Sequence, residues 1–264
     1  MKLPVYEIEG TQFQVDVIAR EMRECANPAN IIGFHEMIDN GESYSFYYDP
    51  VDKNISIDTV YPSIYITVPQ MRHFDPVTMA MHYNYLVADM NLKTDYEIIV
   101  DEELVKLRLG GALPIIKLMD HPFFVDERLG SLRPKDDFRT MGIYFDDMEE
   151  INDRELGFVY DPKKHAIAEL NLQTITKFPK DLYLLHVPHQ WILDPVGWAR
   201  RHGFDLKEVL RKYPPQKDLR ATVIPWRETP LVDIIQKNLW QNFDKNYKNT
   251  IKVSTNKKKK GRGI

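Results

Sequence analysis

Apolar and polar residues alternate at the start of the chain, and this pattern predicts paired β-strands. Between Val5 and Val17 the apolar positions alternate on both sides of Glu9 and Gly10. A glycine at that place supplies the positive φ that a tight hairpin turn needs. The pattern therefore predicts a β-hairpin over residues 5–17.

The same pattern returns in the second half of the chain. Leu3–Ile8 reappears as Leu113–Leu118, shifted by 113 − 3 = 110 positions, and Asp75–Val77 reappears as Asp194–Val196, shifted by 194 − 75 = 119. Matches between these two points keep the same order while the shift grows slowly. Such a series predicts a tandem duplication, with loop insertions chiefly between residues 167 and 187.

Each copy runs from strand patterns into helix patterns. Ile64–Val68 and Tyr183–Val187 read as strands, each followed by a proline that suits a strand end. Asp75 and Asp194 are good helix N-caps, each followed by proline at the first helical position. The chain should therefore be an α+β protein in which several antiparallel strands precede short helices in each copy. Asp120-His121-Pro122 falls at the turn of the second hairpin, so we expect a different turn there.

A further helix and a basic tail follow the second copy. Thr229-Pro230 repeats the cap-then-proline signal before a helical apolar stripe at Leu231, Ile234, Ile235, Leu239 and Phe243. This helix is expected to close the core or to bridge the two copies. The tail is poor in apolar residues, and we expect it to be disordered. The predicted domains are 1–110 (first repeat), 111–222 (second repeat), 223–245 (C-terminal helix) and 246–264 (basic tail).

Composition places the chain among globular proteins of a reducing compartment. An apolar fraction of 43% in 264 residues is enough for sizeable cores. The single cysteine, Cys25, excludes an internal disulfide and is expected to be a buried thiol. No apolar run follows Met1-Lys2 and no stretch reaches the ~18 apolar residues of a membrane span, so we expect a cytoplasmic protein.

Charge is distributed unevenly behind the net value of −4. The last 20 residues hold eight basic and no acidic residues, which leaves 35 − 8 = 27 basic against 39 acidic residues, or −12, for the rest. A basic run can meet nucleic acid, an anionic membrane or an acidic partner, or it can serve as a solvated tail. The candidate nucleic-acid-binding residues of the tail are Lys257, Lys258, Lys259, Lys260 and Arg262.

The stretch Asp194–Tyr213 has the outline of a helix-turn-helix. Ala199, Gly203 and Val209 stand at the spacing of the small residue, the turn glycine and the buried aliphatic of that motif. The second helix could therefore enter a major groove, with nearby cations on phosphates. The candidate nucleic-acid-binding residues of this stretch are Arg200, Arg201, Lys207, Arg211 and Lys212.

The first copy supports a plainer interpretation of the same outline. It keeps Ala80 but has Asn84 at the turn and Met90 at the aliphatic position, and it lacks most of the basic residues. Any tight helix pair can show this spacing, so ordinary helix packing is the alternative to DNA recognition. If the element binds nucleic acid, the second copy's charges must carry the binding.

The residues that could support enzyme chemistry do not form a recognisable constellation. His186 and His189 are three apart across Pro188, and a strand would point them to opposite faces, so we interpret them as structural. The acidic run Asp146–Glu150 reads as a solvated face. With no phosphate-binding glycine loop, nucleophile elbow or Cys-x-x-Cys, we assign no catalytic residue, metal ligand or cofactor.

The four tryptophans all fall in the last third of the chain, at Trp191, Trp198, Trp226 and Trp240. Tryptophan is enriched at binding hot spots, but most tryptophans are largely buried. Core packing and an interaction surface are both open interpretations of this cluster.

The runs Leu3–Gly10, Phe13–Asp16 and Leu132–Phe138 resemble uncharacterised proteins of Bacteroidetes bacteria. The resemblance covers most of the chain. It implies a bacterial cytoplasmic protein carried on mobile elements, and it brings no activity and no catalytic residues.

These observations predict a non-enzymatic cytoplasmic binding or accessory protein. In this hypothesis the second repeat's helix pair and the basic tail contact DNA or RNA, or an acidic protein. The alternative is a protein–protein adaptor that uses the tryptophan-rich last third, and an enzyme of unknown class is the second alternative.

Overall fold

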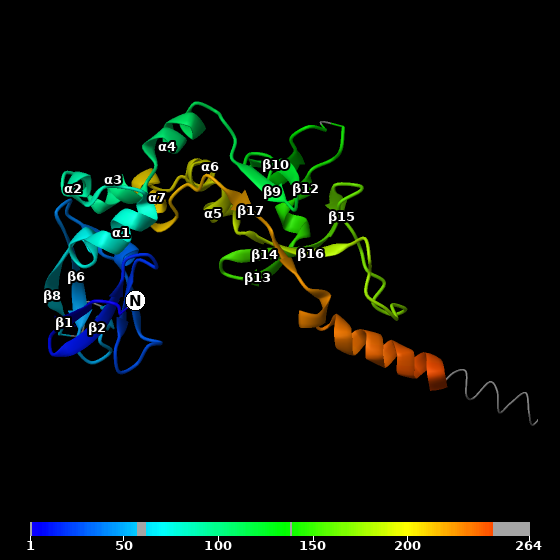
Figure 1. The fold of residues 1–264 in the computed structure, drawn as a ribbon, viewed down its shortest axis with the longest axis horizontal. Coiled ribbons are helices and arrows are strands. Elements are labelled where there is room, and N and C mark those ends of the chain that lie inside the picture. The colour runs from blue at the N-terminus through cyan, green and yellow to red at the C-terminus, as the bar shows by residue number, and fades with distance from the viewer. Residues whose placement is uncertain (1, 57–61, 138, 245–264) are drawn as a thin grey trace, which may run out of the picture. The chain divides into compact units, whose positions relative to one another are not determined.

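The structure is a computed structural model that describes residues 2–56, 62–137 and 139–244. It is an α+β fold in which each half of the chain forms antiparallel sheets followed by short helices (Figure 1). Its contacts divide into two compact units. The first unit comprises Met1–Gly111 and His202–Pro215, and the second comprises Ala112–Arg201 and Gln216–Ile264.

The first unit contains two four-stranded sheets and a group of short helices. One sheet has the order β1-β2-β3-β4, and in the other β5, β7 and β8 all pair with β6. In Figure 1 helices α1 to α3 gather at one end of these sheets. The elements are β1 (Val5–Ile8), β2 (Thr11–Asp16), β3 (Glu21–Glu24), β4 (Ile31–Gly33), the 3-10 helix η1 (Phe34–Glu36), β5 (Ile38–Asp39), β6 (Ser43–Asp49), β7 (Asn54–Ile55), β8 (Ile64–Pro69), η2 (Met71–His73), α1 (Pro76–Tyr83), α2 (Val87–Met90), α3 (Asp95–Ile99), α4 (Glu102–Leu109) and α7 (Leu206–Lys212).

The second unit repeats both sheets and adds a strand to each. Its sheets have the orders β12-β11-β10-β9-β17 and β13-β14-β16-β18, with β15 beside β14. The elements are β9 (Ile115–Leu118), β10 (His121–Asp126), β11 (Ser131–Pro134), β12 (Ile143–Tyr144), η3 (Phe145–Asp147), β13 (Glu149–Asn152), β14 (Glu155–Asp161), β15 (Ala166–Ile167), β16 (Tyr183–Pro188), α5 (Gln190–Leu193), α6 (Pro195–His202), β17 (Leu219–Arg220), β18 (Thr222–Ile224), η4 (Trp226–Glu228) and a helix over residues 231–244.

Strand registers confirm the duplication position by position. Tyr6 pairs with Phe13 in β1–β2, and the residues 110 positions later, Ile116 and Phe123, pair in β9–β10. The second sheets agree as well, since the β6–β8 register reappears between β14 and β16 with shifts of 112 and 119 positions (155 − 43 and 188 − 69). The shifts read from the sequence are thus the shifts of the structure.

Each copy has its own apolar core, built from the inward positions of its two sheets. Phe13, Val15 and Tyr48 are fully buried in the first cluster. Their counterparts Phe123, Val125 and Tyr160 are fully buried in the second. Because a strand points alternate residues to opposite faces, keeping this alternation in both copies keeps the same core.

Two local expectations are corrected. The second hairpin turns at Met119, where φ is 56°, and at Asp120, so His121 and Pro122 belong to strand β10 and not to the turn. Cys25 is exposed rather than buried, because it follows the last residue of β3 in a bend. The first hairpin is as predicted, with φ of 47° at Glu9 and 75° at Gly10.

The C-terminal helix is present over residues 231–244, but its predicted stripe is only partly buried. Leu231 and Ile235 are buried, whereas Leu239 and Phe243 face solvent. Asn238 also attaches the helix, because its side-chain amide donates to the carbonyls of Leu172 and Ile175 in the loop before β16. That loop lies where the duplication predicts its main insertion. The basic tail lies outside the described residues.

Candidate functional site

Both helices of the helix-turn-helix outline are present, and they fall in different units: α6 in the second and α7 in the first. Ala199 is buried on α6, Gly203 has a φ of 72° at the turn, and Val209 is buried on α7. Asp205 caps α7, accepting from the backbone N–H of Glu208 at 2.9 Å. Gly203 therefore takes the left-handed conformation that glycine adopts without strain.

The first copy shows the same burial and the same left-handed turn at the three corresponding positions. Ala80 is buried, Asn84 ends α1 in the left-handed conformation with a φ of 59°, and Met90 is fully buried on α2. The spacing is therefore shared by both copies and does not depend on charge. In the first copy α1 and α2 contact each other, so there the spacing belongs to a packed helix pair.

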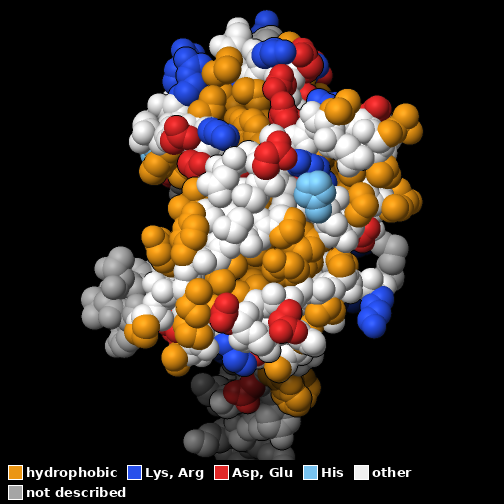
Figure 2. Space-filling model, turned by 90° about the vertical axis from the view of Figure 1, so that its left-hand side faces the viewer, with side chains coloured by type: hydrophobic (Ala, Val, Ile, Leu, Met, Phe, Trp, Pro, Cys, Tyr) orange, Lys and Arg blue, Asp and Glu red, His pale blue; other side chains and the backbone are white. Residues whose placement is uncertain are grey.

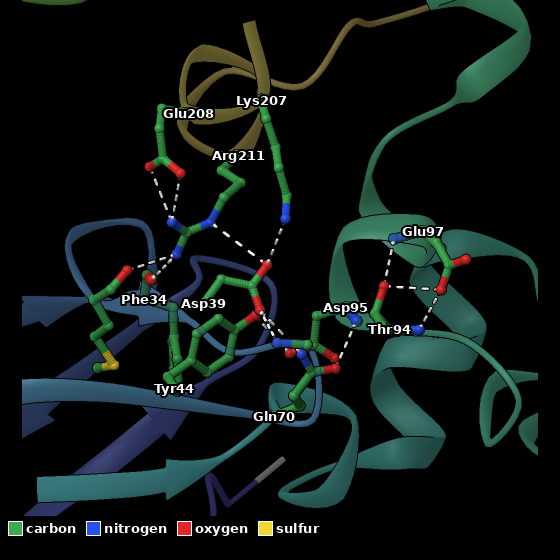
Figure 3. Close-up of polar contacts among 12 residues, drawn as sticks. Phe34, Asp39, Tyr44, Gln70, Thr94, Asp95, Glu97, Lys207, Glu208 and Arg211 are labelled. Carbon is green, nitrogen blue, oxygen red and sulfur yellow. Dashed lines mark hydrogen bonds and ion pairs between the residues drawn. The ribbon is translucent and has the colours of Figure 1, made fainter. Parts of the chain in front are cut away.

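Arg211 of α7 is held within the first unit by backbone carbonyls and carboxylates (Figure 3). Its guanidinium donates to the carbonyl oxygens of Phe34 at 3.2 Å and Met37 at 2.8 Å. It also hydrogen-bonds Glu208 and lies 4.0 Å from a carboxylate oxygen of Asp39. With only 8% of its side chain exposed, Arg211 acts as an anchor for α7.

Arg20 completes this anchor from the opposite direction. Its guanidinium donates to the carbonyl oxygens of Arg211 at 2.7 Å and Lys212 at 3.0 Å, at the C-terminal end of α7. The last carbonyls of a helix lack intrahelical partners, so a cation there both satisfies and orients them. Between the arginines, Asp39 and Tyr44 lies a hollow of about 20 Å³, enough for one water molecule.

The other basic residues singled out from the sequence have varied surroundings. Arg201 donates to the Glu127 carbonyl at 2.7 Å, Lys207 lies 3.9 Å from Asp39, and Lys212 lies over the Tyr213 ring. Arg200 is exposed. The structure therefore brings Lys207 and Arg211 together around Asp39 but places Arg201 in the second unit. Lys257, Lys258, Lys259, Lys260 and Arg262 lie outside the described residues.

A buried polar network beside the anchor was not predicted. The carboxylate of Asp95, fully buried, accepts from the Tyr44 hydroxyl at 2.9 Å and from the backbone N–H groups of Met71 at 2.5 Å and Arg72 at 3.2 Å. Its own N–H donates to the Gln70 side chain at 2.8 Å (Figure 3). Burial raises the pKa of Asp95, and these hydrogen bonds oppose that shift.

Part of this network leaves a trace in the sequence. Thr94 and Glu97 form a capping box that starts α3, a spacing that can be read without a structure. It would have located the helix that carries Asp95. Nothing in the sequence indicates that the residue after the cap faces the core, because that depends on how α3 packs on η2.

Burial and neighbouring charge shift the pKa of His35, which lines the hollow. Burial lowers the pKa of His35 to about 4, and Lys212, Arg20 and Arg211 act in the same direction, while Glu36 opposes them. His35 is therefore neutral at pH 7. A neutral imidazole between cations avoids the repulsion that a charged one would add.

The two histidines of the second copy occupy separate environments. His186 lies 3.8 Å from Glu155, whereas His189 caps α5 and stacks on Trp191 with ring centroids 3.4 Å apart. Within the described residues, no group of three His, Cys, Asp or Glu side chains could hold a metal ion. The acidic residues Asp146, Asp147, Glu149 and Glu150 are exposed, as expected for a solvated face.

The tryptophans divide into packed and exposed positions. Trp191 and Trp198 contact each other edge to face at 5.7 Å, and Trp226 donates to the Leu182 carbonyl at 3.1 Å. Trp240 on the C-terminal helix is 73% exposed. Of the four tryptophans, Trp240 is therefore the one whose ring is mostly exposed to solvent.

Comparison with protein-family models, curated proteins and solved structures found no match. None of the described helices has the length and apolar character needed to cross a membrane.

Proposed function

We propose that this protein is a non-enzymatic adaptor that docks a partner protein on the outer face of its C-terminal helix. The observation that carries the proposal is the exposure of Leu239, Trp240 and Phe243, at 49%, 73% and 64%. Positions i, i+1 and i+4 lie on one side of a helix. Single exposed apolar residues are ordinary, but a cluster that includes tryptophan is typical of an interface.

The helix is fixed in a way that suits presentation of this face. Leu231, Ile235 and Asn238 hold one side against the second unit, and Asn238 is fastened to loop carbonyls at 2.8 and 2.9 Å. The aromatic rings of Trp240 and Phe243 contact each other with centroids 6.3 Å apart. A partner groove that accepts a helix through apolar side chains at this spacing is the matching surface.

The surroundings of α7 favour the adaptor over nucleic-acid binding through the helix pair. Arg211 and Lys207 face Asp39, and Arg201 faces Glu127. A cation that already compensates a carboxylate gains less from a phosphate, because the carboxylate would be left unpaired. Loss of these cations should therefore affect stability more than binding.

Affinity purification with matched variants tests the proposal. We expect the full-length chain, and a chain truncated after Asn246, to retain the same partner from a lysate of the source cell. Trp240→Ala with Phe243→Ala should lose it, whereas Lys237→Ala with Gln241→Ala, on the other exposed side of the helix, should retain it. Retention by the aromatic double variant, or absence of any partner, would refute the adaptor.

Nucleic-acid contact through the tail is the second candidate, favoured by eight basic and no acidic residues in the last 20. Titration with duplex and single-stranded DNA at two salt concentrations should then show a steep salt dependence that the truncation removes. Alanine at Arg200, Arg201, Lys207, Arg211 and Lys212 separates the helix pair from the tail. No binding at low salt would dismiss this candidate.

A further inference from the structure

The two copies differ at one edge of their second sheets. In the second unit β18 pairs antiparallel with β16, placing Leu184 opposite Ile224 and His186 opposite Thr222. The counterpart of β16 in the first unit is β8, and β8 pairs with β6 on one side. Among the described residues, no strand occupies the other side of β8.

Exposure along the two strands reflects this difference. Tyr65 is 55% exposed, whereas its counterpart Leu184 (65 + 119) is half-buried. Ile66 is half-buried, whereas its counterpart Leu185 is fully buried. Side chains of β8 are thus more exposed than their counterparts on β16. In the second copy strand β18 lies beside β16, and the described part of the first copy has no such strand beside β8.

Hydrogen bonds identify which backbone groups of β8 point outward. The Ser56 N–H donates to the Tyr47 carbonyl, so Tyr47 directs its backbone groups toward β7 and away from β8. Tyr47 lies opposite Tyr65. Because directions alternate along an antiparallel ladder, Tyr65 and Thr67 direct their N–H and C=O groups away from β6. Pro69, which has no N–H, follows in the same outward row, where a proline is tolerated.

The second copy shows the same geometry with the edge filled. The Ala168 N–H donates to the Val159 carbonyl, the counterpart of the bond to Tyr47. Leu184 and His186 consequently point their backbone groups toward β18, with which they pair. The outward row of β8 is therefore equivalent to a row that binds a strand.

Among the described residues, the outward row of β8 carries no charged side chain, and its one proline, Pro69, is the last residue of the strand. Natural edges are blunted by charged residues, prolines, bulges or covering loops. The exposed side chains of β8 include Ile64 and Tyr65, which are uncharged, and Tyr65 contacts Tyr47 with ring centroids 5.2 Å apart. Figure 2 looks onto the side of the first unit where β8 lies in Figure 1, and apolar side chains gather on that face.

We propose that the outer edge of β8 binds an extended segment of a partner protein, added antiparallel as β18 is added to β16. The occupant is an uncharged strand with β-branched side chains, like Thr222-Val223-Ile224. Backbone hydrogen bonds to Tyr65 and Thr67 would supply affinity, and Tyr47 with Tyr65 would contact the outward side chains of the added strand. This site is independent of the C-terminal helix.

Amide hydrogen exchange on the full-length wild-type chain is the first test. In the free protein the Tyr65 and Thr67 amides should exchange rapidly while those of Leu184 and His186 are protected. A synthetic peptide with the sequence of residues 219–226, Leu-Arg-Ala-Thr-Val-Ile-Pro-Trp, should slow exchange at Tyr65 and Thr67. Protection in the free protein would overturn the proposal, because the chain or a second copy would then already cover the edge.

Binding of the same peptide, labelled with a fluorophore, is the second test. Thr67→Pro removes an outward N–H and should weaken binding about tenfold or more, whereas Thr67→Ala keeps that N–H and should bind like the wild type. Equal binding by both variants, or none by the wild type, would overturn the proposal. The Trp240→Ala, Phe243→Ala chain should bind the peptide normally, so this result and the adaptor test can fail separately.

Discussion

Arg20 donates to the backbone carbonyl of Arg211 at 2.7 Å, while the guanidinium of Arg211 donates to the carbonyls of Phe34 and Met37. Arg20 therefore satisfies a carbonyl of α7, the helix that carries Arg211. Arg211 in turn satisfies a carbonyl of Phe34, whose own N–H donates to the carbonyl of Arg20. The outcome is that α7, which belongs to the second repeat by sequence, packs as part of the first unit. Its charges serve this attachment.

Replacing Arg211 should destabilise the first unit. Arg211→Ala removes the hydrogen-bond donors to two backbone carbonyls. It also removes a positive charge beside the largely buried carboxylate of Asp39, so the free energy of unfolding should fall by about 2–4 kcal/mol. Arg200→Ala, on exposed α6 surface, should change stability by less than about 0.5 kcal/mol. Equal effects of the two substitutions in urea unfolding would contradict this role for Arg211.

The distribution of tryptophan allows the affected unit to be identified. All four tryptophans lie between residues 191 and 201 or after residue 216, which assigns them to the second unit. Arg211→Ala should shift the unfolding transition followed by far-ultraviolet circular dichroism more than the transition followed by tryptophan fluorescence. A larger shift in the fluorescence transition would mean that the second unit is destabilised more, which would contradict this role for Arg211.

Asp95→Asn should destabilise the same unit through the buried network. An amide has one acceptor oxygen, so its NH₂ group would face a donor from Tyr44, Met71 or Arg72. A cost of about 2–3 kcal/mol is expected for the mismatched buried donors. Asp89→Asn, on the exposed side of α2, is the control and should be nearly neutral. A neutral Asp95→Asn would show that the network contributes little.

His35 should make stability depend on pH. Its pKa is about 4 in the folded protein, below the ordinary value of 6.5, so the unfolded chain binds more protons between these values. Stability should therefore fall as pH decreases from 6.5 to 4 and gain nothing from this group above pH 7. The effect is at most about 3 kcal/mol, reduced by solvent screening of the partly exposed ring. His35→Gln should flatten the dependence in urea unfolding at pH 4.5 and 7, and an unchanged slope would contradict the assignment.

The left-handed turn after α6 should accept the residue that the first copy uses. Gly203→Asn places there the residue found at Asn84, whose φ is 59°, and should cost only a few tenths of a kcal/mol. Gly203→Val should cost about 1–2 kcal/mol, because a β-branched residue is strained at a φ of 72°. Thermal unfolding of the two variants checks the order, and equal melting temperatures would contradict it.

Much of the fold follows from local patterns in the sequence. The Glu9–Gly10 turn, the proline-terminated strands and the Asp-Pro helix starts each depend on neighbouring residues, and the duplication shows each of the shared strands twice. The alternation of apolar residues in the hairpins is local in the same way, and in the structure Phe13 and Phe123 lie on its buried side.

What could not be predicted depends on long-range packing. Nothing near Arg211 in sequence indicates that its partners are Phe34 and Met37, 177 and 174 positions away. The exposed position of Cys25 and the short buried part of the C-terminal stripe likewise depend on which surfaces meet. The basic charge of α7 suggested phosphates, because a sequence does not show which carboxylates a cation will face.

The central claim, that Arg20 and Arg211 jointly fasten α7 to the first unit, is tested most directly by a double-mutant cycle on unfolding free energy. Arg20→Ala and Arg211→Ala should each lower the free energy of unfolding. The double variant should lose about 1 kcal/mol less than the sum of the two single losses. The reason is that loosening α7 by the first substitution already weakens the hydrogen bonds that the other arginine makes. Strictly additive effects, or no effect of either single substitution, would contradict the claim.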